Sequence, residues 1–145
     1  KARSMAGMRI GYAISNPKLI KYLNDAKYSF NSYTMNQTSL LYGVEAVKDR
    51  EYFEETVQKI VDTREWAKGE LAKLGFEFPD SRANFIFATH PNYDAKELFE
   101  ALKKHDIYVR FWGSERIEQY LRITVGTKEE MQILFDFLRE YINNK

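Results

Sequence analysis

The segment Tyr120-Leu121-Arg122-Ile123-Thr124-Val125-Gly126 has the alternation of a β-strand, with one charged side chain in its middle. Successive side chains on a strand point to opposite faces, so Leu121, Ile123 and Val125 share one face and Arg122 points to the other. A guanidinium in a short, mostly apolar strand needs an anionic partner, because burying it unpaired is costly. That partner is a carboxylate of the protein or a carboxylate on a ligand, and the residues alone leave both readings open.

Helical and extended patterns alternate on both sides of this strand, which predicts an α/β architecture. Period-two or short apolar runs predict further strands over residues 8–14, 76–78, 84–88 and 107–111. Helical patterns begin after Asn16-Pro17, cover 34–48, and run from Arg50 to Leu74, where Gly75 is a natural stop. The pairs Asp94 with Glu97 and Thr127 with Glu130 match the capping box that starts a helix, and predict two more.

A domain boundary is predicted near Arg50. Residues 50–145 contain strands and helices with their own apolar faces, enough for a compact unit. Residues 1–49 contain one expected strand and two helices, too little to make a sheet core. We therefore expect residues 1–49 to belong to a larger domain.

Composition excludes several classes of protein. The 145 residues are 44% hydrophobic and 30% charged, as in soluble globular proteins. A net charge of +1 gives no electrostatic footprint for nucleic acid or an anionic membrane, and no apolar run is long enough to span a bilayer. Without cysteine, and with only two histidines, no metal site is expected. A cytoplasmic protein is the default expectation.

The first candidate site is the segment Lys1-Ala2-Arg3-Ser4-Met5-Ala6-Gly7-Met8-Arg9-Ile10-Gly11. A lysine amine can condense with a carbonyl cofactor, and an arginine eight positions later offers a fork of donors for phosphate oxygens. The competing interpretation is that both cations are simply solvated, as most lysines and arginines are. A second candidate pairs Arg122 with Arg110, because the short connection through Gly113 can bring their strands side by side as an anion-recognition site.

Four motifs carry a family resemblance. Lys1-x4-Ala6-Gly7-x-Arg9-x-Gly11 resembles the active-site lysine segment of fold-type I aminotransferases. Leu121-Arg122-Ile123-Thr124-Val125-Gly126-Thr127 is similar to the C-terminal L-R-I-T-V-G-T of histidinol-phosphate aminotransferases. Ser81-Arg82-Ala83-Asn84-Phe85 and Val109-Arg110 resemble two strands of the same family. Together the motifs span essentially the whole chain, in the family's order.

The resemblance implies the C-terminal portion of an aminotransferase fold that depends on pyridoxal phosphate. Residues 1–49 would end the large cofactor-binding domain, and residues 50–145 would form the small α+β domain. Lys1 would bond to the cofactor and move the proton at the substrate α-carbon, and Arg9 would bind the cofactor phosphate. Arg122 would grip the substrate α-carboxylate, and Arg110 would help recognise a substrate phosphate.

The reaction implied is amino transfer between histidinol phosphate and 2-oxoglutarate, by a homodimer. The family's N-terminal half is not in these residues, so the segment alone is expected to be inactive. One departure is Phe30, at a position where many relatives have tyrosine, and it puts the exact substrate in doubt.

Two alternatives remain open at this point. One is a relative with another reaction, such as a different class I or II aminotransferase or a phosphothreonine-type decarboxylase. The other is a non-catalytic α/β binding module, which predicts that residues 1–49 pack into a closed core, with no cofactor and an unmodified Lys1.

Overall fold

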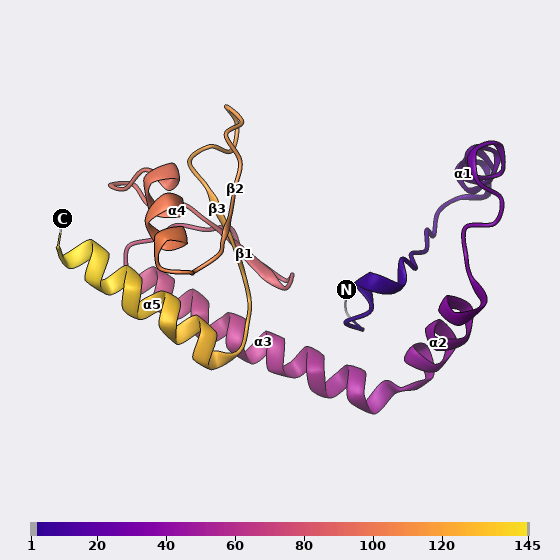
Figure 1. Ribbon diagram of the computed structural model, residues 1–145, viewed down its shortest axis with the longest axis horizontal. Coiled ribbons are helices and arrows are strands. Elements are labelled where there is room, and N and C mark those ends of the chain that lie inside the picture. The colour runs from indigo at the N-terminus through magenta and orange to yellow at the C-terminus, as the bar shows by residue number, and fades with distance from the viewer. Residues whose placement is uncertain (1–2, 145) are drawn as a thin grey trace. The chain divides into compact units, whose positions relative to one another are not determined.

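The computed structural model describes residues 3–144 (Figure 1). Their contacts separate two compact units, Lys1–Thr56 and Val57–Lys145, and the long helix α3 (Arg50–Lys73) contributes to both. None of the helices among the described residues combines the length and apolar composition needed to cross a bilayer.

The first unit is mainly helical. It contains the 3₁₀ turn η1 (Ala6–Met8), helix α1 (Pro17–Phe30), helix α2 (Gln37–Lys48) and the start of α3. The Asn16 side chain caps α1 by accepting a hydrogen bond from the Leu19 N–H at 3.0 Å, as the Asn16-Pro17 pair predicts. Asn36 caps α2 in the same way, with the Ser39 N–H at 2.7 Å. Side-chain caps satisfy backbone donors that a helix start leaves unpaired.

The predicted strand over residues 8–14 is wrong. Residues 6–8 form η1, and the backbone that follows pairs with no strand among the described residues. A strand needs a neighbour to satisfy its backbone groups, and the period-two pattern alone does not supply one. Tyr12 and Ile14 are accordingly 91% and 89% exposed.

The second unit contains a three-stranded antiparallel sheet. Its strands are β1 (Phe85–Ala88), β2 (Arg110–Phe111) and β3 (Leu121–Thr124), in the order β1-β3-β2. The predicted strand over 107–111 is paired only at its last two residues, and that over 76–78 shrinks to one bridge between Glu77 and Thr89. Helices α4 (Ala95–Lys104) and α5 (Lys128–Asn143) complete the unit.

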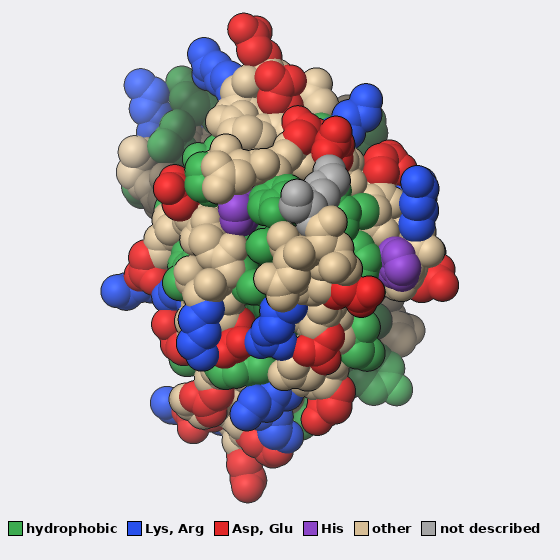
Figure 2. All heavy atoms as spheres, turned by 90° about the vertical axis from the view of Figure 1, so that its left-hand side faces the viewer, with side chains coloured by type: hydrophobic (Ala, Val, Ile, Leu, Met, Phe, Trp, Pro, Cys, Tyr) green, Lys and Arg blue, Asp and Glu red, His purple; other side chains and the backbone are tan. Residues whose placement is uncertain are grey.

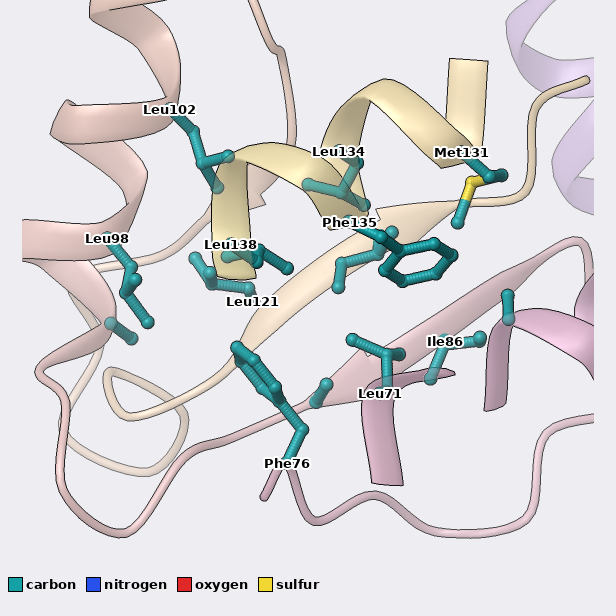
Figure 3. Packing of buried hydrophobic residues seen from close by; sticks show 14 residues of the cluster. Leu71, Phe76, Ile86, Leu98, Leu102, Leu121, Met131, Leu134, Phe135 and Leu138 are labelled. Carbon is teal, nitrogen blue, oxygen red and sulfur yellow. The ribbon is translucent and has the colours of Figure 1, made fainter. Parts of the chain in front are cut away.

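One face of this sheet packs against the helices. Its buried positions alternate along the strands, with Ile86 and Ala88 from β1 and Leu121 and Ile123 from β3. Figure 3 shows side chains from α3, α4 and α5 meeting this face. The helical contribution to the core comprises Ala67, Leu71, Ala95, Leu98, Leu102, Met131, Leu134, Phe135 and Leu138. Because one face is buried, a shift of one residue in register would turn the core side chains outward, so the register is strongly specified.

The three helix boundaries predicted from capping and stop signals in this unit are confirmed. Asp94 caps α4 by accepting a hydrogen bond from the Glu97 N–H at 2.9 Å. Thr127 and Glu130 form a reciprocal capping box at the start of α5. Gly75 follows α3 with φ of +82°, a backbone conformation that residues other than glycine rarely adopt. The imidazole of His90 lies against this turn, its Nε2 at 3.0 Å from the Leu74 carbonyl oxygen.

A buried carboxylate joins α3 to α5. Glu70 accepts from Lys73 Nζ at 2.7 Å and is also paired with the guanidinium of Arg139. The ammonium of Lys73, followed by the guanidinium of Arg139, lowers the pKa of the Glu70 carboxyl. Figure 2 shows cationic and anionic side chains interspersed over one face.

Candidate functional site

The face of the sheet opposite the helices carries Arg122. The side chain lies on the central strand β3 between the core residues Leu121 and Ile123, and it is half-buried, as the alternation predicts. Its Nε atom is buried and has no hydrogen-bond partner in the described part of the chain. No carboxylate among residues 3–144 forms an ion pair with its guanidinium. The sequence left two possible partners for Arg122, a carboxylate of the protein or a carboxylate on a ligand. The described part of the chain does not provide the first.

Arg110 lies directly beside Arg122. The two residues are Cα partners in the antiparallel pair of β2 and β3, so their side chains emerge on the same face. The predicted juxtaposition of two arginines on adjacent strands is thereby confirmed. Arg110 is exposed, and within residues 3–144 it too has no hydrogen bond or ion pair.

Aromatic rings surround the two guanidinium groups. The Arg122 Cζ atom lies 5.3 Å from the ring centroid of Phe85 and 5.4 Å from that of Trp112. The Arg110 Cζ atom lies 5.3 Å from the same Trp112 ring. A guanidinium over a ring face is attracted by the ring quadrupole and keeps its N–H donors available. The face therefore offers two positioned cations with free donors, an arrangement suited to an anion with two charged groups.

Sequence reasoning missed these rings as part of the site. Phe87 supports Trp112 with an edge contact at 6.3 Å, and Tyr120 stacks on Phe87 at 4.5 Å. The signal was present, because Phe85 and Phe87 alternate with the core residues Ile86 and Ala88. That spacing places both phenylalanines on the face opposite the core, which is also the face of Arg122.

The N-terminal candidate residues belong to the first unit. Lys1 lies outside the described residues. Arg9 follows η1 as its C-cap in the left-handed conformation, with φ of +56°, and its exposed guanidinium donates to the Ala6 carbonyl oxygen at 3.4 Å. Among the described residues it has no acidic partner. Ser39 of α2 holds the turn by donating to the Met8 carbonyl oxygen at 3.1 Å. The turn thus presents an unpaired guanidinium that is able to bind an anion.

Comparison with known proteins places the chain in a family. The family model described as aminotransferase class I and II matches residues 1–138. A histidinol-phosphate aminotransferase of Clostridium botulinum is 48% identical over 143 residues, which are 99% of this chain and 40% of that protein. One of Brachyspira hyodysenteriae is 48% identical over 144 residues, 99% of this chain and 41% of that protein.

Solved structures agree with the sequence comparison. The crystal structure of the histidinol-phosphate aminotransferase from Clostridium acetobutylicum superposes with a TM-score of 0.85 at 27% identity, covering 100% of this chain and 44% of the other. The enzyme from Sinorhizobium meliloti, in complex with pyridoxal-5'-phosphate, superposes with a TM-score of 0.82 at 26% identity, covering 99% and 39%.

This chain therefore spans about 40% of the length of the curated relatives that it matches. Similarity over nearly all its residues confirms the expected fold, a partial α/β aminotransferase fold. The match includes the segments that carry Arg9, Arg110 and Arg122. On these grounds the chain belongs to the aminotransferase class I and II family.

Proposed function

We propose that this chain is the C-terminal part of an aminotransferase that depends on pyridoxal phosphate. The reaction is amino transfer between histidinol phosphate and 2-oxoglutarate, giving imidazole acetol phosphate and glutamate. The relatives at 48% identity are named histidinol-phosphate aminotransferase. In this proposal the complete enzyme is cytoplasmic and serves histidine biosynthesis.

One observation supports the proposal above all others, namely the unsatisfied Nε of Arg122. A buried donor without a partner destabilises a fold, so a protein keeps one where a ligand supplies the acceptor. In our proposal that acceptor is the α-carboxylate of glutamate and 2-oxoglutarate, bound by two parallel N–H donors of Arg122. Arg110, one strand away, would bind the phosphate of histidinol phosphate.

The residues at the N-terminal turn fit a phosphate-bearing cofactor. The guanidinium of Arg9 is exposed and lacks an acidic partner among residues 3–144, and the backbone at Gly7 and Gly11 is open, with no heavy atom within 4 Å of an added Cβ. We assign Arg9 to the cofactor phosphate and Lys1 Nζ to the proton at the substrate α-carbon. Bound pyridoxal phosphate supplies the electron sink that makes this carbon acidic.

We also propose that residues 1–49 complete the large domain, that residues 50–145 form the small one, and that the enzyme is a homodimer. Ser39 is the only buried residue among residues 3–49. Large apolar side chains there, including Leu23, Phe30 and Leu41, are more than half exposed. The alternative of a free-standing binding module required a closed core in this part of the chain, and the burial contradicts that requirement.

Substitution of Arg122 in the complete enzyme tests the proposal. Loss of a charge-assisted contact costs roughly 1.5–3 kcal/mol, about ten- to a hundredfold in affinity. Arg122→Ala should therefore raise KM for 2-oxoglutarate by that factor, and KM for glutamate in the reverse direction likewise. Arg116→Ala, in the exposed connection between β2 and β3, is the matched control and should leave both constants within about twofold. Normal binding of 2-oxoglutarate and glutamate by the Arg122 variant would refute the assignment.

The choice of amino donor needs its own measurement. If Arg110 recognises a phosphate, Arg110→Ala should lower kcat/KM for histidinol phosphate far more than for an unphosphorylated donor. An enzyme that already prefers an aromatic or acidic amino acid without phosphate would instead be another member of the family.

A further inference from the structure

The segment that follows Lys1 has little of its own to hold it in place. No residue over 3–9 is fully buried. Among the described residues, the backbone hydrogen bonds of this segment, at 3.1 and 3.2 Å, close the turn η1 and do not reach a helix. Segments with few buried contacts open easily, so side-chain contacts must keep this one in position.

Arg3 joins the segment to the C-terminal end of α2. Its guanidinium donates to the Ala46 carbonyl oxygen, and to that of Asp49 at 3.4 Å. Ala46 lies in the last turn of α2, where carbonyl groups have no partner within the helix and the helix dipole favours a cation. The Arg3 Cζ atom also lies 4.2 Å from the ring centroid of Phe53, at the start of α3. One side chain thus joins the segment to two helices.

The backbone directly after Arg3 is strained. Ser4 has φ of +53°, a left-handed conformation that residues other than glycine keep only where the surrounding structure holds them in it. A second contact with α2 follows, where the Ser39 hydroxyl donates to the Met8 carbonyl oxygen at 3.1 Å. Arg3 and Ser39 therefore fix the strained segment at both of its ends.

The two arginines of the segment have different environments. Arg9 is exposed and has no acidic partner among residues 3–144, so its donors are available to an anion. Arg3 is half-buried, and its guanidinium is already engaged with two carbonyl oxygens and a ring. Arg3 therefore acts on the position of the chain, whereas Arg9 is free to act on a ligand.

We propose that Arg3 is a positioning residue for the amine of Lys1, because it fixes the lysine segment to α2 and to the ring of Phe53. The inference rests on the proposed function of Lys1 and adds the residue that orders its backbone. Lys1 precedes Arg3 by two residues, and a chain of that length spans at most about 7 Å. An anchor at Arg3 thus restricts the volume open to the amine and raises its effective concentration at the cofactor aldehyde.

Binding of pyridoxal phosphate and of pyridoxal to the complete apoenzyme tests this inference. The absorbance of the Schiff base formed with Lys1 measures both affinities. Arg3→Met removes the charge-assisted hydrogen bonds, so it should lower both affinities by the same factor, about tenfold or more, and leave their ratio unchanged. Arg9→Met, which removes a phosphate donor, should lower the affinity for pyridoxal phosphate alone. Arg3→Lys keeps a cation with several donors and should restore most of the loss.

The kinetic constants at saturating cofactor separate positioning from general destabilisation. Because Lys1 is assigned to the proton at the substrate α-carbon, Arg3→Met should lower kcat about tenfold or more and leave KM for 2-oxoglutarate within about twofold. Arg50→Met is the matched control, since Arg50 is an exposed arginine of the same unit, paired with Glu54 at 2.7 Å. It should change neither the two affinities nor kcat by more than about twofold.

A second pair of variants keeps the inference testable if Arg3→Met does not fold. Phe53→Leu removes the ring beside the guanidinium and should lower both affinities about two- to fivefold. Tyr52→Leu, at the exposed neighbouring position, should leave both unchanged.

Unchanged affinities in Arg3→Met, or in Phe53→Leu where that variant replaces it, would overturn the inference. A loss confined to pyridoxal phosphate would also overturn it, because Arg3 would then be a phosphate ligand. Failure of the proposed function is a separate result: the wild-type enzyme would form no Schiff base, or Lys1→Ala would leave its absorbance band in place.

Discussion

Replacing Arg122 by methionine should weaken the binding of 2-oxoglutarate about ten- to a hundredfold without destabilising the fold. Arg122 is half-buried, its Nε has no acceptor among the residues that the structure describes, and its guanidinium lies near the rings of Phe85 and Trp112. Methionine has a similar length, no polar hydrogen, and a thioether that packs well against aromatic rings. It therefore removes the unsatisfied donor and keeps most of the apolar contact.

The magnitude follows from three contributions. Removing a buried, unsatisfied donor raises the free energy of unfolding by about 1–3 kcal/mol. Losing two cation–π contacts lowers the free energy of unfolding by about 0.5–1 kcal/mol each, and the new sulfur–aromatic contacts raise it by about 0.3–1.5 kcal/mol. We expect Arg122→Met to raise the free energy of unfolding by about 1 kcal/mol. Breaking a buried structural ion pair would instead lower it by about 3–5 kcal/mol.

Urea unfolding followed by tryptophan fluorescence measures the difference. Trp66 lies edge-on to the core residue Phe135 at 5.3 Å and reports loss of the core, whereas Trp112 reports the face that carries Arg122. Trp112→Phe in both backgrounds isolates the signal of the core. A loss of 3 kcal/mol or more in Arg122→Met would show that Arg122 is a structural ion-pair residue, and the reasoning that reserves it for a ligand would fail.

Three further predictions concern the fold. Gly75→Ala should lower the free energy of unfolding by about 1 kcal/mol or more, since φ is +82° and the added Cβ would lie 3.0 Å from the Nε2 atom of His90. Gly69→Ala, on an open helix face, is the control and should raise the free energy of unfolding by up to about 1 kcal/mol in the same urea assay. Phe135→Ala, at a fully buried site, should lower the free energy of unfolding by about 3–5 kcal/mol. Ile133→Ala, at a site that is 60% exposed on the same helix, should lower it by less than about 0.5 kcal/mol. Equal effects of the two substitutions would contradict the assigned core. The cationic partners of Glu70 lower the pKa of its carboxyl in the folded state. The ionised carboxylate should therefore stabilise the fold above the ordinary carboxyl pKa, and this stabilisation should be lost as pH falls through the lowered pKa. Glu70→Gln should accordingly make the melting temperature less dependent on pH over that acid range.

Local signals in the sequence predicted most of the helix boundaries. Asn16-Pro17, the Thr127 and Glu130 pair, and Gly75 each act through atoms within a few residues of themselves, and each lies where the structure has the corresponding helix end. The period-two pattern around Arg122 likewise separates a core face from a second face, whatever the neighbouring strands are. These features depend on local geometry, so the order of the residues suffices to predict them.

The same pattern failed over residues 8–14. Alternation shows that a segment could form a strand, but a strand forms only when a neighbour accepts its hydrogen bonds, and none does so among the described residues. The strand over 107–111 was overestimated for the same reason, because only Arg110 and Phe111 pair with β3. Pairing is a property of two segments that lie far apart in the chain.

By itself, the sequence determined the family, the helices and their caps, and the two-faced strand that places Arg122 away from the core. The tertiary structure alone decided that Arg122 has no carboxylate partner among residues 3–144, that Arg110 is its direct neighbour in register, and that the Trp112 ring lies against both. The physical reason is range: caps and alternation involve adjacent residues, whereas the partner of a buried charge is set by strands and rings that only folding brings together.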